Sequence, residues 1–143
     1  MKGMLGIGLV ATAVLLNALA PKPLFAQACK DEQAMIDEFK QGLVTTVDAV
    51  KKESLDNFEK AFHQKSCLTK LTLAINAMDE VLSCLDKASQ DASATKEQLA
   101  AYKAQKESDA KLKEKLTQYK SQLKAIEAPK DAKALIEKFD LSN

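Results

Sequence analysis

Residues 68–85 read LTKLTLAINAMDEVLSCL, and the spacing of their apolar side chains decides the fold. One apolar stripe alternates spacings of three and four residues, as in coiled coils. It consists of Leu68, Leu71, Ile75, Met78, Leu82 and Leu85. A second stripe on the same helix consists of Leu73, Ala77, Val81 and Cys84. A helix that is apolar on two faces contacts two neighbours, so we expect this segment at the centre of a helical bundle.

The segment before this helix is also helical in pattern. Apolar residues recur over 31–52 at spacings of three and four, which predicts a first helix there. The pattern slips before Leu55. Ser54 lies at this slip and is a suitable N-cap, because its hydroxyl can accept a hydrogen bond from a free backbone N–H group. We therefore predict a turn here and a central helix over about 55–89, the alternative being one bent helix that continues to His63.

A third helix is predicted after the central one. Thr95 and Gln98 have the spacing of a capping box, which opens a helix. The helix is expected to run to about Glu127, because Pro129 disfavours helix at the residue before it. Between 103 and 111 its apolar face is interrupted, so this section is expected to be exposed. Pro129 then suits the first position of a short closing helix, whose apolar side chains are Leu135, Ile136 and Phe139.

Glycine and proline are scarce outside the first 28 residues, which hold three of the four glycines and two of the three prolines. Only Gly42 and Pro129 remain. A many-stranded β fold needs such residues in its turns, and a phosphate-binding loop needs several glycines. The sequence therefore predicts an all-α fold, a small bundle of three long helices with a short C-terminal helix, in a single domain over 29–143.

Residues 1–28 have the three parts of a secretory signal peptide. A basic residue precedes an apolar run over 4–20, and the small residues Ala26 and Ala28 suit the pockets of a signal peptidase. Cleavage is therefore expected before Cys29. The rest of the chain holds no second apolar run long enough to span a membrane. We expect the mature protein to be secreted or periplasmic.

Two alternatives to simple cleavage remain open. The apolar run is close to the shortest that can span a bilayer, so one alternative is an uncleaved membrane anchor. The other is a lipid anchor on Cys29, because Ala28 followed by Cys29 resembles part of a bacterial lipoprotein motif. Ala26 departs from that motif, in which leucine is usual three residues before the cysteine.

Three cysteines in an exported chain predict one disulfide and one free thiol. Residues that face each other across an antiparallel helical hairpin have the turn at their midpoint. The midpoint of Cys29 and Cys84 lies between Asp56 and Asn57, where the apolar pattern slips. Either pairing with Cys67 puts the turn inside a continuous helical stripe. We therefore predict a Cys29–Cys84 disulfide and a free Cys67.

Few residues suit catalysis or cofactor binding. His63 is the single histidine, so a site with two histidines is excluded, and the cysteines form no CxxC motif. Cys67 follows His63 by four residues, but no glycine-rich turn accompanies them to hold an oxyanion. We therefore expect no enzyme activity, no catalytic residue, no cofactor and no metal site.

The charges argue against nucleic-acid binding. All 21 basic residues are lysines, and arginine, the usual bidentate reader of phosphate and guanine, is absent. Without the two lysines of the leader, 19 lysines face 20 acids, a net charge of −1. The segment 103–115 holds five lysines interleaved with three acids, so any contact with a membrane surface is expected to be weak.

We expect the mature protein to be a non-enzymatic interaction protein that works as a scaffold, adaptor or periplasmic chaperone and binds another exported protein. The alternative function is a carrier of an apolar small molecule or lipid, in a cavity lined by Phe39, Phe58, Phe62 and Met78. Cavity size distinguishes the two functions, because a carrier needs at least ~300 Å3 between its helices and a packed scaffold does not.

Overall fold

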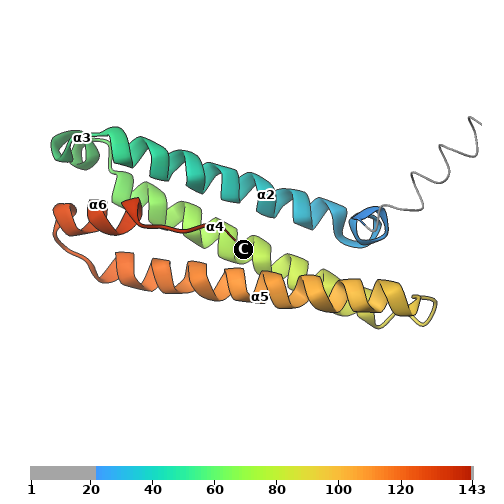
Figure 1. Cartoon of the computed structure of the whole chain (residues 1–143). Helices are drawn as coiled ribbons and strands as arrows, with labels where there is room; N and C mark the ends of the chain where they lie inside the picture. The colour runs from blue at the N-terminus through green and yellow to red at the C-terminus, as the bar shows by residue number, and fades with distance from the viewer. Residues whose placement is uncertain (1–21, 143) are drawn as a thin grey trace, which may run out of the picture.

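The computed structural model describes residues 22–142, and residues 1–21 of the predicted signal peptide lie outside that range. The described residues form five helices, labelled in Figure 1: α2 (Lys22–Lys52), α3 (Leu55–Lys60), α4 (His63–Ser89), α5 (Lys96–Ala125) and α6 (Pro129–Glu137). Over this range the chain has no strand. The predicted all-α bundle of three long helices and a short C-terminal helix is confirmed.

The three long helices α2, α4 and α5 lie side by side, and each reverses the direction of the one before it (Figure 1). α4 packs closely against both α2 and α5, whereas α2 and α5 contact each other far less. α6 packs against α2 and α3 at one end of the bundle, called here the α3 end. α4 is therefore the central helix, as its two apolar stripes predicted.

The predicted central helix over 55–89 is divided in the structure. Ser54 is an N-cap as predicted, since its Oγ accepts a hydrogen bond from the backbone N–H of Asn57, 3.2 Å away. The helix that begins there ends at Lys60. Phe62 then adopts a left-handed conformation (φ 54°, ψ 38°), and α4 starts afresh at His63. The continuous helix was a wrong prediction because an aromatic residue gives no sequence signal for this conformation, which glycine or asparagine would give.

The buried face of α4 lies between the two predicted stripes. Its buried residues are Cys67, Leu71, Ala74, Ala77, Met78, Val81 and Leu85. Leu68, Ile75 and Leu82, which were predicted to form the seam, are only half-buried, and Leu73 is 44% exposed. Because α4 has a neighbour on each side, the line that faces the centre of the bundle runs between the stripes that face each neighbour.

α5 is capped as predicted. Thr95 accepts a hydrogen bond from the backbone of Gln98, and the Gln98 side chain accepts one from the backbone of Thr95. The expected exposure of the whole section 103–111 was wrong, however. Asp109 is only 2% exposed, because it continues the spacing of three and four residues on the buried side of α5. That buried line consists of Tyr102, Gln105, Asp109, Leu112 and Leu116, of which Gln105 is half-buried.

The residues that follow α6 also belong to the core. Phe139 and Leu141 are buried, and the ring of Phe139 stacks on that of Tyr119, with centroids 4.2 Å apart. The Tyr119 hydroxyl accepts a hydrogen bond from the backbone N–H of Asp140, and Lys115 Nζ donates to the carbonyl of Ser142. Residues 139–142 therefore fill part of the space between α2 and α5, which contact each other little.

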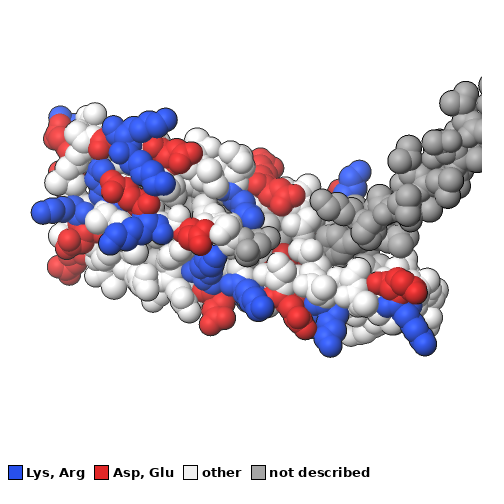
Figure 2. Space-filling model, viewed as in Figure 1, with Lys and Arg blue, Asp and Glu red and all other residues white. Residues whose placement is uncertain are grey.

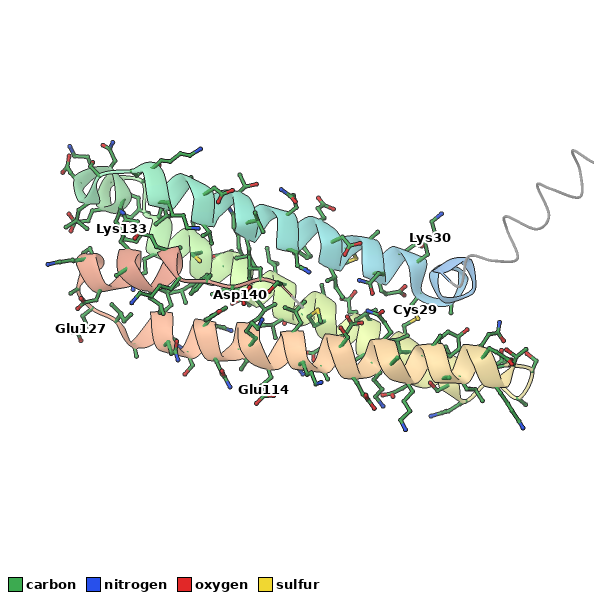
Figure 3. All side chains as sticks on the ribbon, in the orientation of Figure 1. Cys29, Lys30, Glu114, Glu127, Lys133 and Asp140 are labelled. Atoms are coloured by element: carbon green, nitrogen blue, oxygen red, sulfur yellow. A yellow bond between two sulfur atoms is a disulfide. The ribbon has the colours of Figure 1, made fainter. Side chains whose placement is uncertain are left out.

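The structure joins Cys29 and Cys84 in a disulfide, which is the predicted pairing. Their sulfur atoms are 2.14 Å apart and their Cα atoms 6.0 Å apart. Figure 3 shows Cys29 at the end of the bundle away from Glu127 and Lys133, and this end is called here the disulfide end. α2 is kinked at Cys29, whose φ of −134° and ψ of 39° are not helical. Cys67 is free and buried.

Candidate functional site

A pocket at the α3 end is formed by residues of α3, of α4 and of the start of α6. It has a volume of about 370 Å3 and is called here the Phe62 pocket. Its lining residues are Phe58, Glu59, Phe62, His63, Gln64, Lys65, Leu68 and Pro129. The apolar members come from three segments that the turn at Ser54 and the start of α6 bring together. The pocket therefore depends on the tertiary fold.

Among residues 28–142, Phe62 is the most exposed large apolar residue, with 72% of its surface accessible. Its backbone has a positive φ, which costs a residue with a side chain about 1–2 kcal/mol relative to the right-handed conformation. The local bend therefore turns a phenyl ring outward at a conformational cost. Such outliers gather at functional positions, where the rest of the fold holds them in place.

The floor of the Phe62 pocket is held by contacts to the core. Phe58 is almost completely buried, and its ring stacks on the imidazole of His63, with centroids 5.9 Å apart. His63 Nε2 lies 2.6 Å from Oε2 of Glu53, although the two atoms do not have the angles of a hydrogen bond. Because Glu53 follows α2 and His63 begins α4, this contact connects the two helices. His63 is therefore a packed residue of the turn.

Gln64 connects the start of α4 to the end of α5. Its side-chain Nε2 donates to the carbonyl oxygens of Leu123 (3.1 Å) and Ile126 (2.8 Å). The carbonyls at the end of a helix lack N–H partners further along the helix. The Gln64 amide adds a second donor to Leu123, which also accepts from the backbone N–H of Ile126, and supplies a donor to the C-cap residue Ile126. The contact spans about sixty residues of sequence, and no local pattern signals it. It fixes the wall of the Phe62 pocket on the α4 side.

We expect Phe62→Gly to leave the fold intact and to raise the free energy of unfolding by up to about 1 kcal/mol. Glycine adopts the left-handed conformation without strain, and an exposed phenyl ring contributes little packing. Urea unfolding followed by circular dichroism measures the change, with Leu73→Gly in the middle of α4 as the destabilised control. A clear loss of stability in Phe62→Gly would show that the ring is needed for folding.

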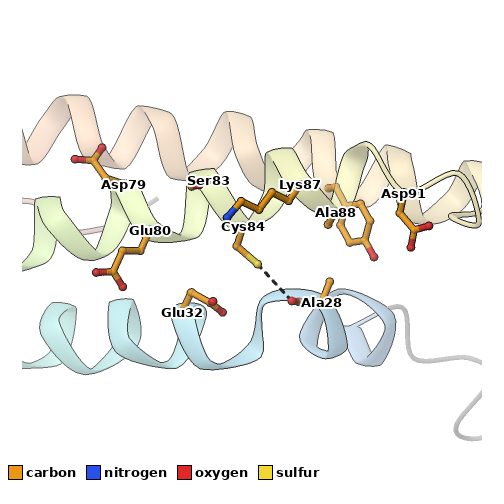
Figure 4. A pocket seen from close by; sticks show the side chains of 10 residues that line it. Ala28, Glu32, Asp79, Glu80, Ser83, Cys84, Lys87, Ala88 and Asp91 are labelled. Atoms are coloured by element: carbon orange, nitrogen blue, oxygen red, sulfur yellow. Dashed lines mark hydrogen bonds between the residues drawn. The ribbon is translucent and has the colours of Figure 1, made fainter.

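A second hollow lies beside the disulfide (Figure 4). This groove has a volume of about 740 Å3, and its carboxylates are Glu32, Asp79, Glu80 and Asp91. Cys84 Sγ lies 3.3 Å from the carbonyl oxygen of Ala28, a van der Waals contact because a disulfide sulfur carries no proton. Within residues 22–142, no three side chains are placed to hold a metal ion. The acids of this groove are spread over α2, α4 and the loop that follows α4, so they do not converge on one point.

A polar cluster interrupts the core between α2 and α5. Gln105 Nε2 donates to Oδ1 of Asp109 (2.9 Å) and reaches Oε1 of Gln33 on α2 (3.4 Å). The other carboxylate oxygen of Asp109, Oδ2, is buried without a hydrogen bond from any described residue. Burial raises the pKa of Asp109, and the nearby charge of Asp37 raises it further, against the opposite effects of the Gln105 hydrogen bond and Lys40.

We expect Asp109→Asn to unfold at higher urea concentration than the wild type at pH 7, by on the order of 1 kcal/mol, because burial desolvates the charged form of the Asp109 carboxyl group and the amide carries no charge. A raised folded-state pKa means that Asp109 favours folding below its unfolded pKa and loses that contribution as pH rises through the folded pKa. The advantage of the variant should therefore shrink toward pH 4. The exposed Glu107→Gln is the control, and an advantage independent of pH would contradict the assigned cause.

The free cysteine, Cys67, is poorly suited to act as a nucleophile. Burial raises the pKa of the Cys67 thiol to about 12, against an opposing effect of Lys70. At neutral pH the thiol therefore stays protonated, and the thiolate is the reactive form. Its neighbour on the helix, His63, is engaged with Glu53 and Phe58.

The four residues predicted to line a carrier cavity are not together. Phe58 and Phe62 share the Phe62 pocket, whereas Met78 is buried in the core and Phe39 is half-buried on α2. The pocket is a hollow in the surface and not a chamber between the long helices.

The lysines of the segment 103–115 are partly paired with acids of α4. Lys106 forms an ion pair with Asp86, and Lys113 forms one with Asp79. Figure 2 shows positive and negative side chains interleaved over the face of the molecule that is seen in Figure 1. None of the helices in residues 22–142 is long and apolar enough to cross a membrane.

Comparisons of the chain with protein-family models, with curated proteins and with solved structures found no match.

Proposed function

We propose that the protein is a non-enzymatic interaction protein that binds another protein molecule at the Phe62 pocket. The observation that carries this proposal is the outward phenyl ring of Phe62, 72% exposed on a left-handed backbone beside an apolar hollow. Aromatic side chains next to a pocket are typical anchors of protein interfaces, where a few such residues supply most of the binding free energy. A role as scaffold, adaptor or chaperone agrees with this kind of contact.

The pocket also supports a second candidate, the carrier of an apolar small molecule or lipid. Its volume of about 370 Å3 is within the range of small-molecule sites, which begins at ~300 Å3. Two of the aromatic residues expected in a carrier, Phe58 and Phe62, line it. The open shape favours the protein partner, because a carrier site covers most of its ligand.

Photo-crosslinking in the native compartment tests the proposal. A photoreactive phenylalanine analogue replaces Phe62 in one sample and the exposed Leu73 in a control sample. We expect a protein adduct at position 62 and none at position 73. Mass spectrometry of the adduct identifies the partner, which is then purified and titrated against the wild type and Phe62→Gly. A lipid or small-molecule adduct at position 62, without protein, would support the carrier instead.

We propose further that the protein acts outside the cytoplasm, as a secreted or periplasmic protein. The signal-peptide pattern of residues 1–28 and the Cys29–Cys84 disulfide support this, because disulfides persist in oxidising compartments. The proposed cleavage before Cys29 coincides with the kink of α2. A lipid anchor on Cys29 is disfavoured, because the sulfur that would carry the lipid is bonded to Cys84.

Intact-mass measurement of the exported protein tests this location and its disulfide. The expected product begins at Cys29 and is two hydrogen atoms lighter than its fully reduced form. Alkylation after unfolding should label Cys67 alone. A mass that retains Met1, or one increased by a diacylglycerol, would contradict simple cleavage.

A further inference from the structure

We propose that the partner seated on the Phe62 pocket is a second copy of this chain, in a two-fold dimer in which each Phe62 ring enters the pocket of the other copy. This rests on the proposed function, since it names the protein that the Phe62 pocket binds. The chemistry recognised is an exposed phenyl ring beside a pocket that also carries one acidic and one basic side chain, and the chain itself presents all three.

The surface is complementary to itself. It carries an outward ring, Phe62, and immediately beside it an apolar hollow whose walls include Phe58, Leu68 and Pro129. In a two-fold interface each contact occurs twice, because the same patch serves both subunits. A single two-fold operation can therefore place both rings in both hollows, and the two Phe62 side chains then lie next to each other near the axis.

The charges around the pocket agree with the same arrangement. Glu59 lies three residues before Phe62 and Lys65 three residues after it, and both line the pocket. Both are exposed, and neither side chain forms an ion pair with another side chain of residues 28–142. In the proposed dimer the two-fold axis runs between Glu59 and Lys65, so that Glu59 of one copy meets Lys65 of the second copy. Opposite charges then face each other twice.

The site is preorganised, but it is small. The contacts of Phe58 with His63 and of Gln64 with the end of α5 fix its walls, so little side-chain ordering is needed on association. One ring and one pocket per copy form much less than the roughly 1,600 Å2 of a standard stable interface. We therefore expect a reversible dimer with a dissociation constant in the micromolar to millimolar range.

Sedimentation equilibrium of the purified chain over that concentration range tests the dimer. We expect the wild type to shift from monomer to dimer with rising concentration. Phe62→Gly should weaken the dimer by about 100-fold or more, since it removes both rings. Circular dichroism of the variant confirms that it is folded.

Charge reversal separates a second copy from any other partner. Glu59→Lys and Lys65→Glu should each weaken the dimer by about tenfold, because each replaces two attractive contacts by two repulsive ones. The double variant Glu59→Lys/Lys65→Glu should restore the wild-type dissociation constant, since it restores opposite charges at both contacts. Glu114→Lys, on the exposed side of α5, is the matched control and should leave dimerisation unchanged.

Three results would overturn the homodimer. The wild type could remain monomeric over the whole concentration range, the dimer could persist in Phe62→Gly, or the double reversal could fail to restore it. The photo-crosslink at position 62 tests the proposed function separately. Capture of a different protein would support that function without the homodimer, and capture of no protein would contradict both.

Discussion

Replacement of both Cys29 and Cys84 by alanine is expected to lower the free energy of unfolding by about 4 kcal/mol. The bond links residues 55 apart, and a closed loop of this length removes that much chain entropy from the unfolded state in the loop-entropy model. The bond also ties Cys29 on α2 to the end of α4, at the disulfide end of the bundle and opposite the α3 end (Figures 1 and 3). Loss of the bond should therefore loosen the disulfide end most.

Urea unfolding with and without a reductant measures this effect and supplies its control. The reductant should destabilise the wild type to the level of the double variant and should leave the double variant unchanged. Hydrogen exchange should become faster in α2 near Cys29 than in α2 near Val50. If non-reducing peptide mapping finds Cys67 in the bond, the pairing and the position of the turn are both wrong.

Leu71→Ala is expected to destabilise the fold by about 2–5 kcal/mol, and Leu73→Ala, two residues away on the same helix, by less than about 1 kcal/mol. Leu71 is fully buried on α4, so its truncation loses transfer free energy and leaves a cavity, whereas Leu73 is 44% exposed. Both variants change the same residue type in the same helix, so their helix propensities cancel. Thermal or urea unfolding measures the two values, and equal values would show that the buried face of α4 is misplaced.

The fold was predictable where local chemistry determines it. The caps at Ser54 and Thr95 and the apolar periodicity place the starts of α3 and α5 and the centre of α4. The turn position then selected Cys29–Cys84 among three pairings, because helices of similar rise bring equidistant residues face to face.

The candidate site was not predictable from these patterns. The break at Phe62 depends on a left-handed conformation that aromatic residues rarely adopt, so the periodicity alone favours a continuous helix. Gln64 reaches the end of α5 across the bundle, a contact set by tertiary packing. Asp109 has the spacing of a core residue, but charged residues are seldom buried. Its burial was therefore not predicted from the sequence.

Hydroxyl-radical footprinting measures whether a protein covers the Phe62 ring, and it needs no substitution in the binding surface. The rate of oxidation of Phe62 is compared with that of Leu73 in the same molecules, first in dilute purified protein and then in the native compartment. We expect Phe62 to react several times more slowly in the native compartment, because a protein covers its ring, while Leu73 reacts at the same rate in both. Equal rates for Phe62 in the two samples would mean that the ring stays open to solvent and would contradict its role as the binding surface.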